Sequence, residues 1–177
     1  MRLEPGQPAE DFQVEDIFGR PVRLIDFQSR KLLLAFFRYA SCPLCNLRVH
    51  SLIQQYEALQ AKGLDVVAFF QSPPESIRQY VGRQDAPFPV VADPDRVVYR
   101  LYGVESSWPK FILGSMRLAS LIKAAIKGFL PGKMEGSIPL VPADFLIGPD
   151  LTISQVYYGK DIGDHMPLED IEAWLDW

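Results

Sequence analysis

Two cysteines three positions apart are the residues of this chain best suited to chemistry. Cys42 and Cys45 are its only cysteines, and they follow the apolar run 32–37, which predicts a buried strand. A segment with helical periodicity comes directly after them. C-x-x-C between a strand and a helix is typical of thiol redox sites, since sulfurs one helical turn apart can close a disulfide after small adjustments. The sequence therefore predicts a redox-active dithiol.

The predicted helix suggests a different role for each sulfur. Pro43 suits the first helical position, and Gly63 suits the residue that ends the helix. Cys42 then lies at or near the N-cap, where unpaired N–H groups lower a thiol pKa. One apolar face recurs at steps of four and three: Cys45, Val49, Leu52, Tyr56 and Leu59. We therefore predict that Cys42 is the reachable, attacking thiol and that Cys45 is the sheltered, resolving thiol.

Two structural interpretations compete with the redox dithiol. A structural disulfide between these cysteines would close too short a loop to constrain the unfolded chain much. A zinc site needs four ligands, and the chain has no second C-x-x-C and only His50 and His165, which are far apart. The redox dithiol is the interpretation that we favour.

Composition restricts the class of protein. The 177 residues are 48% hydrophobic and 23% charged, which predicts one globular domain, residues 1–177, with an insertion. A net charge of −4 without a basic stripe argues against a nucleic-acid partner. The N-terminus has no apolar signal core, and no apolar run approaches the roughly 18 residues of a membrane span. Two cysteines in redox spacing indicate a reducing compartment, so we expect a cytoplasmic protein without membrane association.

Predicted strands and helices alternate along the chain. Beyond the cysteine helix, a hairpin spans 12–24, strands cover 64–70, 88–93, 143–147 and 152–158, and helices cover 73–83, 93–102 and 168–174. This order predicts an α/β fold, a mixed sheet with helices on both faces. In such folds ligands bind where strands meet helix N-termini, which is where Cys42 falls.

Residues 104–141 form a connection far longer than usual and predict a helical insertion. Residues 113–130 have helical periodicity, with one apolar face and the cations Arg117, Lys123 and Lys127. A basic amphipathic helix can lie on a membrane or dock on a partner. We expect this one to pack over the protein's own core or over a twin subunit, because three cations are few for lipid binding. It could also form a wall of the cysteine cleft.

Several motifs resemble one known family. Residues 37–47, FRYASCPLCNL, resemble the F-Y-R-x-x-x-C-P-x-C-N-L signature of peroxiredoxin-like proteins in the alkyl hydroperoxide reductase/thiol-specific antioxidant family. FPVVADP at 88–94, PADFLI at 142–147 and KMEG at 133–136 resemble further stretches of that family, in order, and the likeness extends over 5–175. The resemblance implies a thioredoxin-like fold and antioxidant thiol chemistry.

The chain departs from that family at three functional positions. In true peroxiredoxins, a proline and a threonine cradle the peroxide beside the attacking cysteine; Arg38 and Cys42 stand at those positions here if Cys45 takes the attacking one. The strand position of the family's catalytic arginine matches Pro142, which also resembles the cis-proline of thioredoxin-like folds. Alignment with the family thus makes Cys45 the attacking residue, whereas the helical stripe favours Cys42.

Further side chains near the dithiol are candidates for positioning substrate. Arg38 could supply the lost positive charge, or could pair with a surface carboxylate instead. The hydroxyls of Tyr39 and Ser41 could contact substrate or only satisfy the loop. Trp108 could line the cleft or join the core. His50 is expected to face solvent or cap the helix. Residues 161–165 contain Asp161, Asp164 and His165, which we expect to make local turn hydrogen bonds.

The sequence thus predicts a thiol-dependent antioxidant oxidoreductase. It would reduce peroxides or disulfides by cycling Cys42 and Cys45 between dithiol and disulfide. We expect no cofactor and no metal, only an external thiol reductant such as thioredoxin or glutathione; a homodimer is one candidate assembly. The alternative is a thioredoxin-fold binding or structural protein with weak catalysis, or a zinc-held module.

Overall fold

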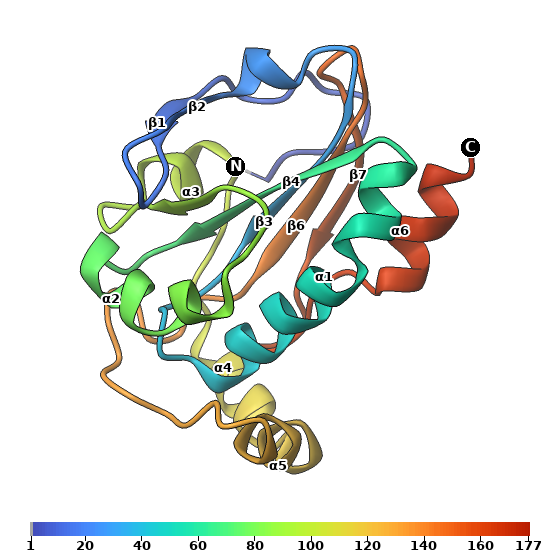
Figure 1. Ribbon diagram of the computed structural model, residues 1–177. Helices are drawn as coiled ribbons and strands as arrows, with labels where there is room; N and C mark the ends of the chain where they lie inside the picture. The colour runs from blue at the N-terminus through green and yellow to red at the C-terminus, as the bar shows by residue number, and fades with distance from the viewer. Residues whose placement is uncertain (1) are drawn as a thin grey trace.

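A five-stranded mixed sheet forms the centre of the protein, as the computed structural model of residues 2–177 shows (Figure 1). Its strand order is β5-β4-β3-β6-β7. β3 pairs in parallel with β4 and antiparallel with β6. The bounds are β3 Lys31–Phe36, β4 Leu64–Phe70, β5 Val90–Ala92, β6 Ala143–Ile147 and β7 Ile153–Tyr158. The predicted α/β fold with a mixed sheet is confirmed.

Helices and a small hairpin cover the two faces of this sheet. α1 (Pro43–Ala61) and α6 (Leu168–Leu175) lie on one face, where both contribute to the same hydrophobic core (Figure 1). α3 (Val97–Leu101) and the hairpin of β1 (Gln13–Glu15) and β2 (Pro21–Arg23) contribute to a second core on the other face. Short elements complete the fold: η1 Leu24–Phe27, α2 Pro74–Gln79 and η2 Val81–Gln84. The single helix expected over 73–83 is therefore wrong, because the helical backbone is interrupted at Tyr80.

The central strand ends at the edge of the sheet where the cysteines lie. All but the first residue of β3 are buried, as a continuous apolar run predicts for a strand covered on both faces. Beyond its end, the buried hydroxyl of Tyr99 donates to the carbonyls of Phe37 (2.7 Å) and Phe69 (2.8 Å). This bifurcated contact ties the ends of β3 and β4 together and fixes where the chain leaves the sheet towards Cys42.

The start of α1 agrees with the prediction from the sequence. Cys42 is the N-cap residue, with extended backbone angles (φ −69°, ψ 119°), and Pro43 is the first helical residue. The buried side chain of Asn46 donates to the carbonyls of Ala40 (2.7 Å) and Cys42 (3.0 Å). These bonds clamp the turn before the helix. Gly63 follows the helix with a φ of +87°, a conformation that suits glycine.

The insertion holds two short helices, so the single helix expected over 113–130 is wrong. α4 spans Trp108–Ser115 and α5 spans Leu118–Ile126, below the N-terminus of α1 in Figure 1. The break occurs at Arg117, whose ψ of 60° is not helical. Its guanidinium reaches Asp161 (2.8 Å) and Asp164 (3.4 Å), and these ion pairs hold the kink against the loop before α6.

Candidate active site

Cys42 and Cys45 are both free thiols, and each is only 1% exposed. Cys42 lines a cavity of about 370 Å³, whereas Cys45 is not part of the cavity wall and packs in the core that α1 shares with the sheet. Cys42 is therefore reached through the cavity and not from bulk solvent, a distinction that the sequence could not show. The sheltered position expected for Cys45 is confirmed.

Arg38 places a buried positive charge beside Cys42. Its Nη1 donates to Cys42 Sγ at 3.5 Å and its Nη2 to the carbonyl of Ile138 at 2.6 Å. The guanidinium also lies 4.8 Å from the ring centre of Tyr39 and 5.4 Å from that of Phe111. Arg38 is 1% exposed, and no carboxylate within residues 2–177 pairs with it. The alternative of a surface ion pair is therefore wrong, and Cys42 is the group that can balance this charge.

The two thiols have opposite pKa shifts. Burial opposes ionisation of Cys42, but the hydrogen bond from Cys45, the charge of Arg38 and the N–H groups of Cys45 and Leu44 outweigh it and lower its pKa to about 6. Burial, the hydrogen bond to Cys42 and the Cys42 charge raise the pKa of Cys45 well above its ordinary value. Cys42 is thus a thiolate at neutral pH while Cys45 keeps its proton.

Tyr39 and Ser41 differ in how close they come to substrate space. Tyr39 lines the cavity, and its pKa is raised to about 12, chiefly by burial and then by the Cys42 charge, so its hydroxyl stays protonated. Ser41 does not line the cavity: its hydroxyl donates to the carbonyl of Lys133 at 2.6 Å. Ser41 therefore anchors the chain that follows α5.

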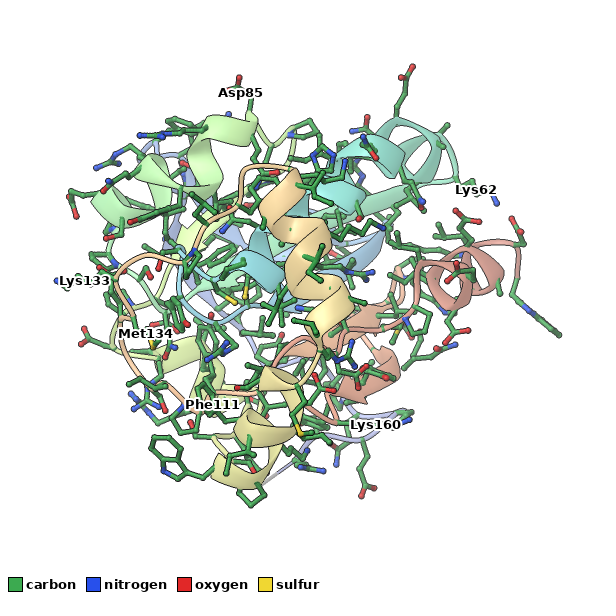
Figure 2. All side chains as sticks on the ribbon, turned by 90° about the horizontal axis from the view of Figure 1, so that it is seen from below. Lys62, Asp85, Phe111, Lys133, Met134 and Lys160 are labelled. Carbon is green, nitrogen blue, oxygen red and sulfur yellow. The ribbon has the colours of Figure 1, made fainter. Side chains whose placement is uncertain are left out.

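The insertion supplies most of the remaining cavity wall. Its apolar side chains come from α4, from α5 and from the chain that follows, and they include Phe111, Leu121, Phe129 and Met134. Figure 2 looks onto this side of the molecule, with Phe111 labelled beside α4 and Met134 labelled by the segment that follows α5. Sequence reasoning allowed for a wall here but did not identify these residues. The only available signal was their apolar character in an unusually long connection.

Residues 131–138, which we call the arm, close the cavity by crossing back to the sheet. The side-chain amide of Gln71 donates to the carbonyl of Ser137 and accepts from its N–H, both at 2.9 Å. Gly136 makes this possible: its φ is +67°, and a Cβ there would lie 2.6 Å from Gln71 Oε1. The position requires glycine for space as well as for conformation.

We expect Gly136→Ala to loosen the arm and to speed alkylation of Cys42 by iodoacetamide several-fold, because the added methyl group breaks the Gln71–Ser137 pairing. Gly128→Ala is the matched control, since Gly128 also has a positive φ (+82°) but nothing within 4 Å of a Cβ. Both variants carry backbone strain, and only Gly136→Ala carries the clash. Equal alkylation rates in the two variants would show that the arm does not control access.

Neither Trp108 nor Pro142 lines the cavity that Cys42 lines, contrary to the roles considered for them. Trp108 is 60% exposed and does not line the cavity; its ring packs edge-on against Phe111, with ring centres 5.7 Å apart. It belongs neither to the cleft nor to the core, because it begins α4 on the outer side. Pro142 lines a different depression, with Lys110 and Gly159 among its neighbours. No cis peptide bond occurs within residues 2–177, so the expected likeness to a cis-proline is wrong.

Asp161 and Asp164 make the predicted local turn hydrogen bonds, in addition to their ion pairs with Arg117. Asp161 accepts from the N–H of Gly163, and Asp164 accepts from that of Lys160, each at 2.8 Å. His165 is different: its Nδ1 lies 3.0 Å from the buried Asp144 carboxylate, and its ring packs against that of Phe37 at an interplanar angle of 42°, with ring centres 4.7 Å apart. Within residues 2–177, no three His, Cys, Asp or Glu side chains are grouped as a metal site.

Comparisons with known proteins agree with this geometry. The model of the AhpC/TSA family matches residues 5–156. A protein of Mycobacterium tuberculosis, provisionally named as a peroxiredoxin, is 30% identical over 119 residues, which cover 66% of this chain and 76% of that protein. Peroxiredoxin Bcp of Escherichia coli K12 is 29% identical over 125 residues, 69% of this chain and 80% of its own.

A solved structure shows the same fold over the whole length. The crystal structure of peroxidoxin BcpB from Mycobacterium tuberculosis superposes on 99% of this chain and 97% of its own, with a TM-score of 0.71 at 17% identity. This chain belongs to the AhpC/TSA family and has the thioredoxin-like fold that its motifs predicted.

Proposed function

We propose that this chain reduces hydroperoxides through a Cys42/Cys45 dithiol–disulfide cycle. One observation carries the proposal: Cys42 lines an apolar cavity, and the buried cation that contacts it, Arg38, has no carboxylate partner in the described chain. A thiolate is thereby stabilised where a small substrate can reach it. The family and the relatives named as peroxiredoxins support the same chemistry.

The first step oxidises Cys42. Its thiolate attacks the terminal oxygen of a hydroperoxide, the O–O bond breaks, and a sulfur–oxygen bond forms. The departing alkoxide takes a proton and leaves as an alcohol, or as water if the substrate is hydrogen peroxide. Cys42 becomes a sulfenic acid. Arg38 and Tyr39 face the same space and can donate hydrogen bonds to the oxygen that develops charge.

The second step uses Cys45. Its thiol attacks the Cys42 sulfenic sulfur, water leaves, and a Cys42–Cys45 disulfide forms. An external dithiol, such as thioredoxin, or two molecules of glutathione then reduce this disulfide and become oxidised. No metal or nucleotide is required. We propose a reducing compartment, the cytoplasm, as the place where such thiols are supplied.

A disulfide substrate is the second candidate, favoured by the C-x-x-C spacing. Its sulfur would have to approach Cys42, which is 1% exposed and covered by α4, α5 and the arm. A small hydroperoxide enters the cavity without this obstacle. We therefore propose peroxide as the oxidising substrate and thiol exchange as the resetting step.

Mass spectrometry of the reduced protein after one equivalent of hydroperoxide tests the proposal. We expect the intact mass to fall by two hydrogens, and peptide mapping to locate the bond between Cys42 and Cys45. An inert thioredoxin-fold binding protein would keep both thiols reduced under these conditions. Two reduced thiols, together with no rapid consumption of the peroxide, would contradict the proposed function.

A further inference from the structure

The insertion carries a concentration of exposed apolar side chains that the proposed chemistry does not explain. Among the large hydrophobic residues that are exposed in the described chain, nine of fourteen lie between 108 and 134. Six of them define what we call the outer face: Ile112, Leu113 and Met116 around α4, and Leu118, Ile122 and Ile126 on α5. Their exposed fractions range from 51% to 81%.

α5 is apolar on two opposite sides. Leu121 and the buried Ala124 pack inward towards the cavity and α1. Leu118, Ile122 and Ile126 follow one another at steps of four, so they form a stripe that points outward. A surface helix normally has charged or polar residues on its outer side. The segment was expected to pack over the protein's own core or over a twin subunit. Only its inward side packs on the core, which leaves the outward stripe uncovered in the described chain.

Charge indicates the chemistry of a partner that would cover this stripe. Residues 106–134 contain five basic and no acidic residues, which leaves 13 basic against 22 acidic residues in the rest of the chain. Arg117 is neutralised by Asp161 and Asp164. Lys110, Lys123, Lys127 and Lys133 form no ion pair with an acidic side chain within residues 2–177. Lys110 donates to the carbonyl of Gly159 (2.8 Å) and Lys127 lies 3.1 Å from His50 Nε2, so both are held against the protein. Lys123, next to Ile122 on α5, and Lys133, in the arm, are exposed. The surface of the insertion is thus apolar and cationic on an otherwise acidic protein.

A second copy of the chain does not satisfy this charge. A two-fold interface would bring the same face of each subunit together, and with it the same lysines. An anionic lipid bilayer satisfies both properties, because apolar side chains enter the boundary between headgroups and acyl chains while lysines reach the headgroups. We propose that the outer face of α4 and α5 docks on an anionic lipid bilayer.

Docking would turn the mouth of the Cys42 cavity towards the lipid. Ser115, Ala125 and Met134 line the cavity and are also exposed on the surface. Ser115 and Ala125 are next in sequence to Met116 and Ile126 of the outer face. The cavity itself is walled by Phe111, Leu121 and Phe129. The substrates that this arrangement favours are hydroperoxides carried on lipid acyl chains, an inference that rests on the proposed function, whereas the docking itself does not.

Co-sedimentation of the full chain with vesicles tests the docking. We expect binding to phosphatidylcholine vesicles that contain phosphatidylglycerol, and about tenfold weaker binding to phosphatidylcholine alone or in high salt. Ile122→Glu and Lys123→Glu should each weaken binding to the anionic vesicles by about tenfold or more. Neither residue lines the cavity, so both variants should reduce hydrogen peroxide at the wild-type rate.

Two matched controls separate docking from general effects of charge. Ile25→Glu changes an isoleucine that lies outside the insertion and has the same exposed fraction as Ile122, 51%. Arg100→Glu makes the same change of charge as Lys123→Glu, on α3 at the other face of the sheet. Both controls should bind vesicles within about twofold of the wild type, since neither residue contributes to the outer face.

Three outcomes would overturn the docking proposal: no binding to anionic vesicles, equal losses in the controls, or a stable dimer that Ile122→Glu dissociates. Activity assays then test the substrate class separately. Suppose that the wild type docks on vesicles and reduces hydrogen peroxide as expected. If it then reduces lipid hydroperoxide in anionic vesicles no faster than Ile122→Glu does, only lipid hydroperoxide is rejected as the substrate. Failure with hydrogen peroxide as well would reject the proposed function and leave docking standing.

Discussion

Cys42→Ser is expected to lose all measurable reaction with hydroperoxide, while Cys45→Ser should complete the first step and stop there. The thiolate at Cys42 lines the cavity, and its replacement removes the only nucleophile that substrate can reach. Cys45 lies outside the cavity wall, and its raised pKa keeps it protonated at neutral pH. Serine at position 45 therefore removes only the thiol that resolves the sulfenic acid.

Single-turnover measurements distinguish these two variants. With one equivalent of hydroperoxide, Cys45→Ser should consume substrate and yield a sulfenic acid at Cys42 that reacts with dimedone. Its multiple turnover with a thiol donor should fall by several orders of magnitude, because no disulfide forms for the donor to reduce. Cys42→Ser should neither consume substrate nor react with dimedone. Circular dichroism of both variants serves as the control for folding.

The opposite assignment remains testable in the same experiment. Alignment with the family signature places the attacking cysteine at Cys45. If that assignment held, Cys42→Ser would consume one equivalent of hydroperoxide and carry the sulfenic acid at Cys45. The observed geometry argues against it, since Arg38 contacts Cys42 Sγ and, of the two cysteines, only Cys42 lines the cavity.

Local signals were enough to predict the framework of the site. The buried strand, the N-cap position of Cys42 and the inward face of α1 follow from patterns within a few residues of one another. Their physical causes, apolar periodicity and helix capping, act over such short distances. The strands and the order of elements along the chain were predictable for the same reason, whereas the order of the strands within the sheet was not predicted.

Contacts between distant segments could not be predicted. The carbonyls of Ile138 and Lys133 hold Arg38 and Ser41, and they lie about a hundred positions further along the chain. The kink at Arg117 depends on Asp161, and no local residue pattern announces an ion pair across 44 positions. Pro142 and Trp108 were chosen from family likeness and residue type, neither of which fixes where a side chain lies in space.

Arg38→Met is expected to slow the reaction with hydroperoxide at pH 7 by up to about a hundredfold, because the thiolate fraction of Cys42 falls about tenfold for each unit by which its pKa rises above the pH of the assay. Methionine keeps an unbranched chain against Tyr39 and Phe111 but removes the charge beside the thiolate. The pKa of Cys42 should then rise from about 6 towards its ordinary value of 9.0. Arg38→Lys keeps the positive charge but lacks the guanidinium group that also donates to the carbonyl of Ile138. It should therefore retain more of the wild-type rate than Arg38→Met does.

The pH dependence of alkylation separates this electrostatic role from a structural one. In the wild type, the alkylation rate of Cys42 should rise with pH through about 6 and level off above it. The reason is that the thiolate is the main form above this lowered pKa and becomes protonated below it. In Arg38→Met the same curve should shift to higher pH and reach a similar plateau. A lower plateau with an unchanged midpoint would mean that Arg38 only shapes the cavity. The charge of this buried cation, which has no carboxylate partner in the described chain, would then not stabilise the Cys42 thiolate.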